Sequence, residues 1–180
     1  MIITLQTVDG RKDIQIQPGD AFASRSDKWY SKCIRFFSAI WSRDGVADYS
    51  HTGLLLAGDM TFEALYSGIT ICGAEKYRGE QVIIVRFDSV SGPKREAILK
   101  EVVARFAGRK YPFWRLAMHM LGPVAKICWL KIPVCSELIA FYEYRLGIRH
   151  SKWAGTSPDT LVDEWRQWRG VTVLGEGRVD

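Results

Sequence analysis

The spacing of apolar residues predicts two amphipathic helices at well-separated places in the chain. In residues 27–43, apolar residues recur at helical intervals, and Asp27 stands near the start of the segment. Those apolar positions are Trp29, Cys33, Phe36, Phe37 and Ile40. A second helical pattern covers residues 94–108, with charged residues opposite the apolar face and a stop at Gly108. Its apolar positions are Ile98, Val102 and Phe106.

Three segments between these helices have the pattern of strands. They are residues 49–57, 60–67 and 81–88, all rich in residues that suit a pleated and partly buried surface. Because a turn-like Ala-Gly-Asp separates the first two, we expect a hairpin within an antiparallel sheet. Residues 21–26 fit a short strand or a loop.

Helical patterns return in the last third of the chain. Residues 113–121 form one such stretch, and another runs from Cys135 to Gly147. After Ser157-Pro158 we expect a short helix in a region that borders the cleft, and the tail from Gly170 is predicted to be a loose end. Strands that are central in sequence, with helices before and after them, indicate the α+β class.

Composition limits the organisation and the setting. The 180 residues are 47% hydrophobic, with no repeat and no linker, so we expect one domain spanning residues 1–180. No secretory signal opens the chain, and charges interrupt its longest apolar region, so we expect a cytoplasmic protein without a transmembrane segment. The net charge of +5 favours an anionic partner, for which nucleic acid, anionic lipid and bacterial wall polymers all qualify.

His51 is the strongest candidate base among the three histidines. His119 lies in an apolar helical stretch and His150 in a polar turn, where structural or solvated roles are the simpler expectation. His51 opens an apolar strand, and a hairpin centred on residue 57 would place Glu63 directly opposite it. A carboxylate beside an imidazole can orient the ring for nucleophilic catalysis, although a structural polar pair is the alternative.

Cys135 is the candidate nucleophile. Pro133 favours a helix start there, and a helix N-terminus stabilises a thiolate and offers N–H groups to an oxyanion. For the other cysteines, Cys33, Cys72 and Cys128, packing is the simpler role. No pair has the CxxC or HxxxH spacing of zinc sites, so we expect neither a metal nor a cofactor.

Five ordered motifs resemble a known family. They are Gly19-Asp20, Ser50–Gly53, Glu63-Ala64, Gly108–Tyr111 and Cys135–Leu138. In this order they resemble the circularly permuted branch of the NlpC/P60 papain-like cysteine hydrolases, specifically the YiiX/YebB-like group. In ordinary papain-like enzymes the cysteine precedes the histidine, and here the order is reversed. The resemblance implies a permuted papain-like fold in which an antiparallel sheet packs with helices.

The resemblance also implies the site and its chemistry. Cys135 would be the nucleophile, His51 the base and later the acid, and Glu63 the residue that orients His51. Tyr111 and Ser136 are expected to contact the substrate, although Pro112 departs from the aspartate that often follows that tyrosine in the family. The implied activity is a cysteine peptidase or amidase acting through a thioester, with peptidoglycan fragments among the candidate substrates.

Two alternatives stay open at this point. The same superfamily includes lipid acyltransferases and esterases, so an acyl substrate at a membrane surface is the first. The second is a non-catalytic module whose basic, tryptophan-rich surface binds an anionic partner. Scattered tryptophans are more typical of core anchors, and no nucleic-acid-binding signature accompanies them, so we do not expect a nucleic-acid partner.

Overall fold

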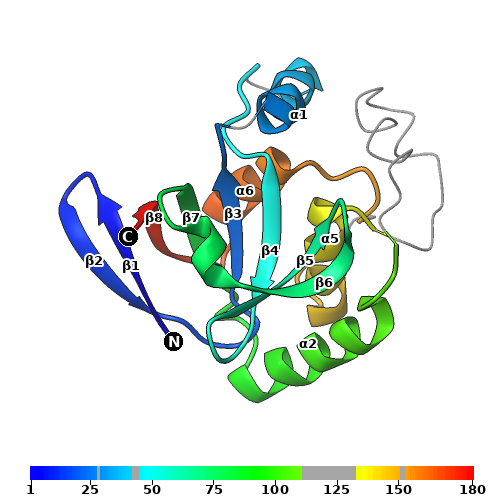
Figure 1. Ribbon diagram of the computed structural model, residues 1–180. Helices are drawn as coiled ribbons and strands as arrows, with labels where there is room; N and C mark the ends of the chain where they lie inside the picture. Colours follow the sequence, from blue (N-terminus) through cyan, green and yellow to red (C-terminus); the bar gives the residue numbers. More distant parts are fainter. Residues whose placement is uncertain (28, 42–44, 111–132, 151–152) are drawn as a thin grey trace.

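A single antiparallel sheet forms the centre of the protein (Figure 1). The computed structural model describes residues 1–27, 29–41, 45–110, 133–150 and 153–180. Eight strands are ordered β2-β1-β8-β7-β3-β4-β5-β6, and each pairs antiparallel with its neighbours. The strands are β1 Ile2–Thr7, β2 Gly10–Gln15, β3 Ala21–Arg25, β4 His51–Leu55, β5 Met60–Leu65, β6 Gly68–Gly73, β7 Gln81–Arg86 and β8 Thr172–Val179.

Helices accompany the sheet, which confirms the α+β class and its antiparallel pairing. They are α1 Trp29–Trp41, α2 Gly92–Phe106, α5 Cys135–Leu146, α6 Pro158–Gln167 and the short 3-10 helix η1 Ala74–Tyr77. In Figure 1, α1 and α2 lie at opposite ends of the molecule. The segments expected at 27–43, 94–108, 135–147 and after Ser157 all contain helices.

Both faces of the central strands are covered. Along β7, Ile83 and Val85 join the cluster formed with helices α2, α5 and α6, while Val82 and Ile84 join a second cluster under the β1–β2 hairpin. On α2 the buried positions are Leu99, Val102 and Phe106, together with Arg95. Ile98, expected on that face, is only partly buried.

The expectation of a loose C-terminal tail is wrong. Residues Thr172–Val179 form β8, which lies inside the sheet between β1 and β7. Gly175 and Gly177 hide the strand pattern, because neighbouring atoms of Ile14 and Gln6 leave no room for a side chain at these positions. The β1–β2 hairpin and β6 are further strands that the sequence patterns did not predict.

The β4–β5 register differs from the predicted one. Leu54 pairs with Phe62 and Leu55 with Thr61, so the hairpin is centred on residue 58 and not on residue 57. Its turn contains Gly58 and Asp59, both with positive φ. His51 and Glu63 are therefore diagonal neighbours, but they stay on one face because the change in register keeps the alternation of side chains.

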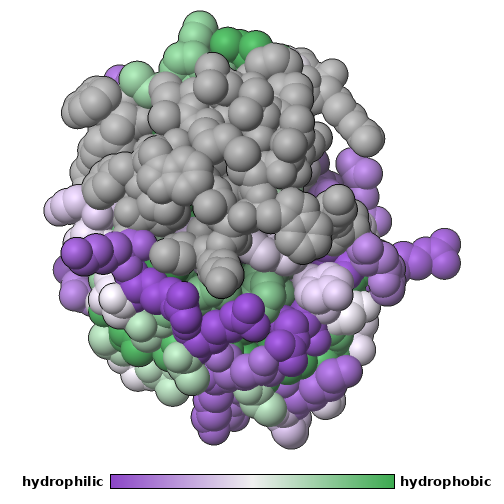
Figure 2. Space-filling view, turned by 90° about the vertical axis from the view of Figure 1, so that its right-hand side faces the viewer, coloured by the Kyte–Doolittle hydropathy of each residue, from purple (hydrophilic) through white to green (hydrophobic). Residues whose placement is uncertain are grey.

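Several expectations concern parts of the chain outside the described residues. These are the helix at 113–121, Tyr111, His119 and Cys128. Within the described ranges, no helix combines the length and the apolar composition needed to cross a membrane. Helix α1 exposes Phe36 and Ile40, and apolar surface appears at the corresponding end of the molecule in Figure 2.

Candidate active site

His51 and Glu63 form a direct pair on one face of the sheet. His51 is the first residue of β4, and its Nε2 lies 2.7 Å from Oε2 of Glu63 on β5. The Glu63 side chain is buried completely, whereas 20% of the His51 side chain is exposed. The carboxylate therefore anchors one nitrogen of a ring whose other edge can reach a reacting group.

Gly53 makes this pairing possible. A Cβ at Gly53 would lie 2.7 Å from Cγ of Glu63 and 2.6 Å from Cε1 of Phe22. Such contacts are shorter than carbon atoms tolerate, so any side chain here would displace Glu63 or the Phe22 ring. The last residue of the Ser-His-Thr-Gly motif must therefore be glycine for steric reasons.

Four side chains donate hydrogen bonds to Glu63. Oε2 accepts from His51, from Nζ of Lys76 at 2.9 Å and from the Tyr77 hydroxyl. Oε1 accepts from the hydroxyl of Thr61. A buried carboxylate surrounded in this way is satisfied as an anion, so it can stay charged out of water.

The pKa values of His51 and Glu63 are both far from their ordinary values. Burial opposes the charged form of His51, but hydrogen bonds with Cys135 and Glu63 outweigh it and raise the pKa of His51 to about 10. Burial likewise opposes the anion of Glu63, yet the hydrogen bond and charge of His51, with the charge of Lys76, lower the pKa of Glu63 to about 2. Both shifts favour an imidazolium beside a carboxylate.

Cys135 is the first residue of α5 and reaches the same histidine. Cys135 acts on the His51 ring strongly enough to raise the pKa of that ring, and Nδ1 is the ring nitrogen left for sulfur because Nε2 is bonded to Glu63. Cys135 is 8% exposed, and Val134 before it is extended. The sulfur therefore lies near the helix N-terminus, where amide N–H groups lack intrahelical partners.

The first turn of α5 is anchored to the segment that follows the helix. Glu137 Oε1 accepts from the N–H of Gly155 at 2.7 Å, and its Oε2 accepts from the N–H of Val134 at 3.2 Å. Ser136 is 1% exposed, and its hydroxyl donates to the carbonyl of Thr156 at 2.6 Å. Ser136 is thus engaged in packing, and its contact with substrate stays a prediction.

The chain before His51 is anchored as well. The Ser50 N–H donates to the carbonyl of Ser24 at 3.1 Å, and its hydroxyl bonds that of Ser31 on α1. The Asp48 N–H donates to Asp159 of α6 at 2.9 Å. The region after α5 therefore contacts the chain just before His51, and its expected place along a cleft stays a prediction.

The remaining candidates lie elsewhere. Cys33 and Cys72 are free and partly buried, on α1 and β6, and His150 is exposed. Sequence reasoning missed Lys76, Tyr77, Thr61 and Glu137. A signal exists only for Glu137, because a glutamate three residues after a helix N-cap often bonds the chain at that end.

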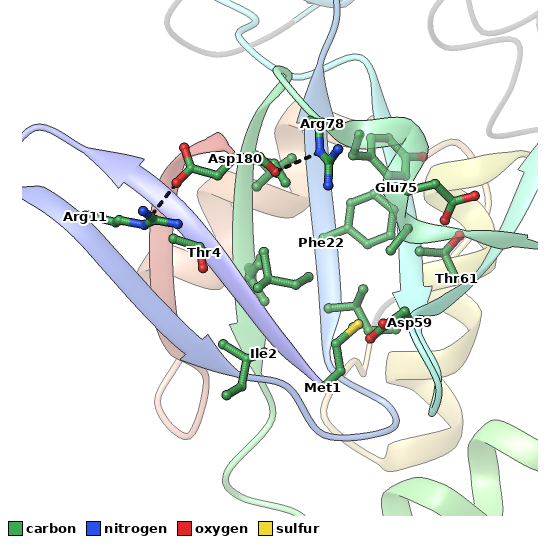
Figure 3. A pocket seen from close by; sticks show the side chains of 17 residues that line it. Met1, Ile2, Thr4, Arg11, Phe22, Asp59, Thr61, Glu75, Arg78 and Asp180 are labelled. Carbon is green, nitrogen blue, oxygen red and sulfur yellow. Dashed lines mark hydrogen bonds and ion pairs between the residues drawn. The ribbon is translucent and has the colours of Figure 1, made fainter.

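A cavity of about 520 Å³ lies on the same sheet face (Figure 3). Thr61 and Tyr77 line it, whereas His51 and Cys135 do not. Its apolar floor includes Phe22 and Leu55, each only 2% exposed. The Cys135–His51 pair therefore lies outside this cavity.

Comparison with known proteins supports the fold. The chain is similar to the crystal structure of the metalloprotein YiiX from Escherichia coli O157:H7 (DUF1105), with a TM-score of 0.54 and 19% identity. The match covers 92% of this chain and 89% of YiiX. No protein-family model and no curated protein matches the sequence. The chain thus shares a YiiX-like fold.

YiiX is described as a metalloprotein, but the surroundings of Glu63 in this chain do not suit a metal ion. The oxygens of Glu63 already accept four hydrogen bonds, and one donor is the Lys76 ammonium, which would repel a cation. Across the described ranges, no group of three His, Cys, Asp or Glu side chains is arranged to hold an ion. The residues at the His51–Glu63 pair do not fit a metal site.

Proposed function

We propose that the protein is a cysteine hydrolase that cleaves an amide or peptide bond through Cys135, His51 and Glu63. The observation that carries the proposal is the position of the His51 ring, which bonds Glu63 through Nε2 and interacts with Cys135 at the start of α5. An acid–imidazole–thiol series of this kind is the arrangement that activates a cysteine nucleophile. Cell-wall peptides are the substrate class suggested by the motif resemblance.

The proposed reaction has two halves. His51 takes the proton of Cys135, the sulfur attacks the carbonyl carbon, and N–H groups at the start of α5 hold the oxyanion. The C–N bond breaks as His51 gives its proton to the leaving nitrogen, and a thioester remains. Water then loses a proton to His51 and attacks the thioester. The C–S bond breaks, the acid leaves and His51 returns the proton to sulfur.

The first test needs no substrate. Iodoacetamide labelling, resolved by peptide mass spectrometry, would compare Cys135 with Cys33 and Cys72 in the same sample. An ordinary cysteine has a pKa of about 8.5 and is almost fully protonated at about pH 6, so a Cys135 activated by His51 should label faster there than the other two. His51→Gln should remove the difference. Equal pH dependence for the three thiols in the wild-type protein would overturn the proposal.

A substrate screen would follow with Cys135→Ala as the control. Peptidoglycan fragments, short peptides and acyl esters represent the candidate classes. Release of an amine that Cys135→Ala abolishes would support the hydrolase and identify the substrate class. Absence of turnover on every class, with Cys135 reactive in the labelling test, would restrict the proposal to the nucleophile.

One observation favours an acyl ester at a membrane surface as a second candidate substrate. Helix α1 exposes 64% of Phe36 and 55% of Ile40, and its charged residues, Lys32 and Arg35, are all basic. Basic amphipathic helices with exposed apolar side chains bind anionic lipid surfaces. Vesicle sedimentation with Phe36→Asp/Ile40→Asp as the control, together with turnover of a fatty acyl ester, would separate this candidate from a peptide hydrolase.

A further inference from the structure

Glu63 holds two cationic partners on a single oxygen. His51 Nε2 lies 2.7 Å from Oε2, and Lys76 Nζ lies 2.9 Å from the same atom. Lys76 belongs to η1, which directly follows β6. Because β6 runs antiparallel to β5, the chain after β6 comes back close to Glu63. The Glu63 side chain is buried completely, whereas 33% of the Lys76 side chain is exposed.

We infer that Lys76 is a positioning residue that limits the basicity of His51 by sharing the negative charge of Glu63. The inference rests on the proposed function for its catalytic meaning. A histidine paired with a lone carboxylate holds its proton strongly and becomes a poor acid toward the leaving nitrogen. A second positive charge on that carboxylate weakens the hold while the hydrogen bond that orients the ring is kept.

The other groups around His51 and Glu63 differ from Lys76 in charge or in position. Tyr77 and Thr61 also donate to Glu63, but both are neutral donors. Cys135 faces His51 from α5, and Glu80 acts on Tyr77 through its charge. Lys76 is the lysine bonded to Glu63, and its charge contributes to the low pKa of that carboxyl. Removing the charge of Lys76 should therefore raise the pKa of His51.

The test follows the His51 ring by NMR during a pH titration, in a Cys135→Ala background where the thiol makes no contribution. Lys76→Met should raise the midpoint of His51 by about 0.5–1 pH unit at low salt, because an exposed charge is partly screened. Lys76→Arg keeps the charge and should leave the midpoint near that of the parent protein. Lys76→Gln keeps a donor without the charge and should behave like Lys76→Met.

The matched control is Lys100→Met, which breaks the exposed ion pair with Glu96 on α2 and should leave His51 unchanged. An unchanged midpoint in Lys76→Met, with a native circular dichroism spectrum, would overturn the inference. So would equal shifts in Lys76→Arg and Lys76→Met. If Lys76 tunes His51 but Cys135 of the wild-type protein labels like an ordinary thiol, the proposed hydrolase fails and the role of Lys76 stands.

Discussion

His51 and Glu63 are joined by a 2.7 Å contact between Nε2 and Oε2, although they are not cross-strand partners. Gly53 lies two residues after His51 on β4, next to Glu63, and leaves space for its side chain. The contact therefore depends on a residue without a side chain as much as on the two residues that form it. Perturbing any of the three should change both stability and thiol reactivity.

Removing His51 should flatten the alkaline part of the stability profile. The pKa of His51 rises from 6.5 to about 10 on folding, so its stabilising effect is complete below about pH 6.5 and is lost as pH increases through about 10. Urea unfolding across this range should show His51→Gln to be less stable by about 2 kcal/mol at the neutral end. The two proteins should converge at the alkaline end.

His150→Gln is the matched control for this experiment, because His150 is exposed. It should follow the wild-type profile throughout. A His51→Gln profile parallel to that of the wild type, with no convergence, would contradict a raised pKa for His51.

Replacing Glu63 should alter the acid part of the profile. Its pKa falls from 4.5 to about 2 on folding, so the stabilisation is present above about pH 4.5 and is lost as pH falls through about 2. Glu63→Gln should cost about 2–4 kcal/mol near neutrality, because Gln offers one oxygen to four donors. The difference from the wild type should shrink toward low pH.

Glu101→Gln removes a carboxylate from an exposed ion pair with Arg145 and serves as the control for Glu63→Gln. Its effect should be within about 1 kcal/mol at every pH. A constant difference between Glu63→Gln and the wild type down to the acid limit would argue against a lowered Glu63 pKa.

Gly53→Ala should loosen the His51–Glu63 pair although neither of the two residues is replaced. The added methyl group would meet Phe22 and Glu63 at 2.6 and 2.7 Å, and such overpacking costs about 1–3 kcal/mol. Because Glu63 must move, iodoacetamide labelling of Cys135 at about pH 6 should slow by about 10-fold or more. Gly92→Ala, where the nearest atom is 4.0 Å away, is the control, and equal labelling rates in the two variants would contradict a role for Gly53.

The predictable parts of the fold were those with uninterrupted patterns. The helix from Cys135 has a strong start and a Gly147 stop with φ of 80°, so its bounds could be read closely. β8 could not, because Gly175 and Gly177 are required by neighbouring strands and erase the alternation that marks a strand. The β4–β5 register was off because the prediction made His51 and Glu63 direct partners, whereas Leu54 pairs with Phe62.

The candidate site also has contacts that the sequence predicts and contacts that it does not. His51 and Glu63 could be paired from sequence because a hairpin links them and an error of register that preserves the face still brings them together. Lys76 and Tyr77 reach Glu63 only through the path of β6 and η1, and no spacing rule connects them to it. Contacts made by a returning loop depend on the whole topology, which local patterns do not encode.

The buried pair of Glu143 and Arg149 should contribute strongly to the stability of the folded protein where α5 packs against α6. Arg149 Nε lies 2.8 Å from Oε2 of Glu143, and Trp165 of α6 donates to Oε1 at 2.5 Å. Burial is the main cause that raises the pKa of Glu143 to about 7, with Arg149 opposing it. Arg149→Met should therefore destabilise the protein by about 3–5 kcal/mol, because it leaves a buried carboxyl without its cation.

This destabilisation should depend on pH in a defined direction. Without Arg149 the pKa of Glu143 rises further, so ionisation in the folded state becomes more costly as pH increases above the unfolded value of about 4.5. Urea unfolding should show a larger loss for Arg149→Met at about pH 8 than at about pH 5. Adding Glu143→Gln should remove that dependence, and Arg145→Met, in an exposed pair, should cost no more than about 1 kcal/mol. A loss for Arg149→Met that is the same at both pH values would show that Glu143 is not the group left uncompensated.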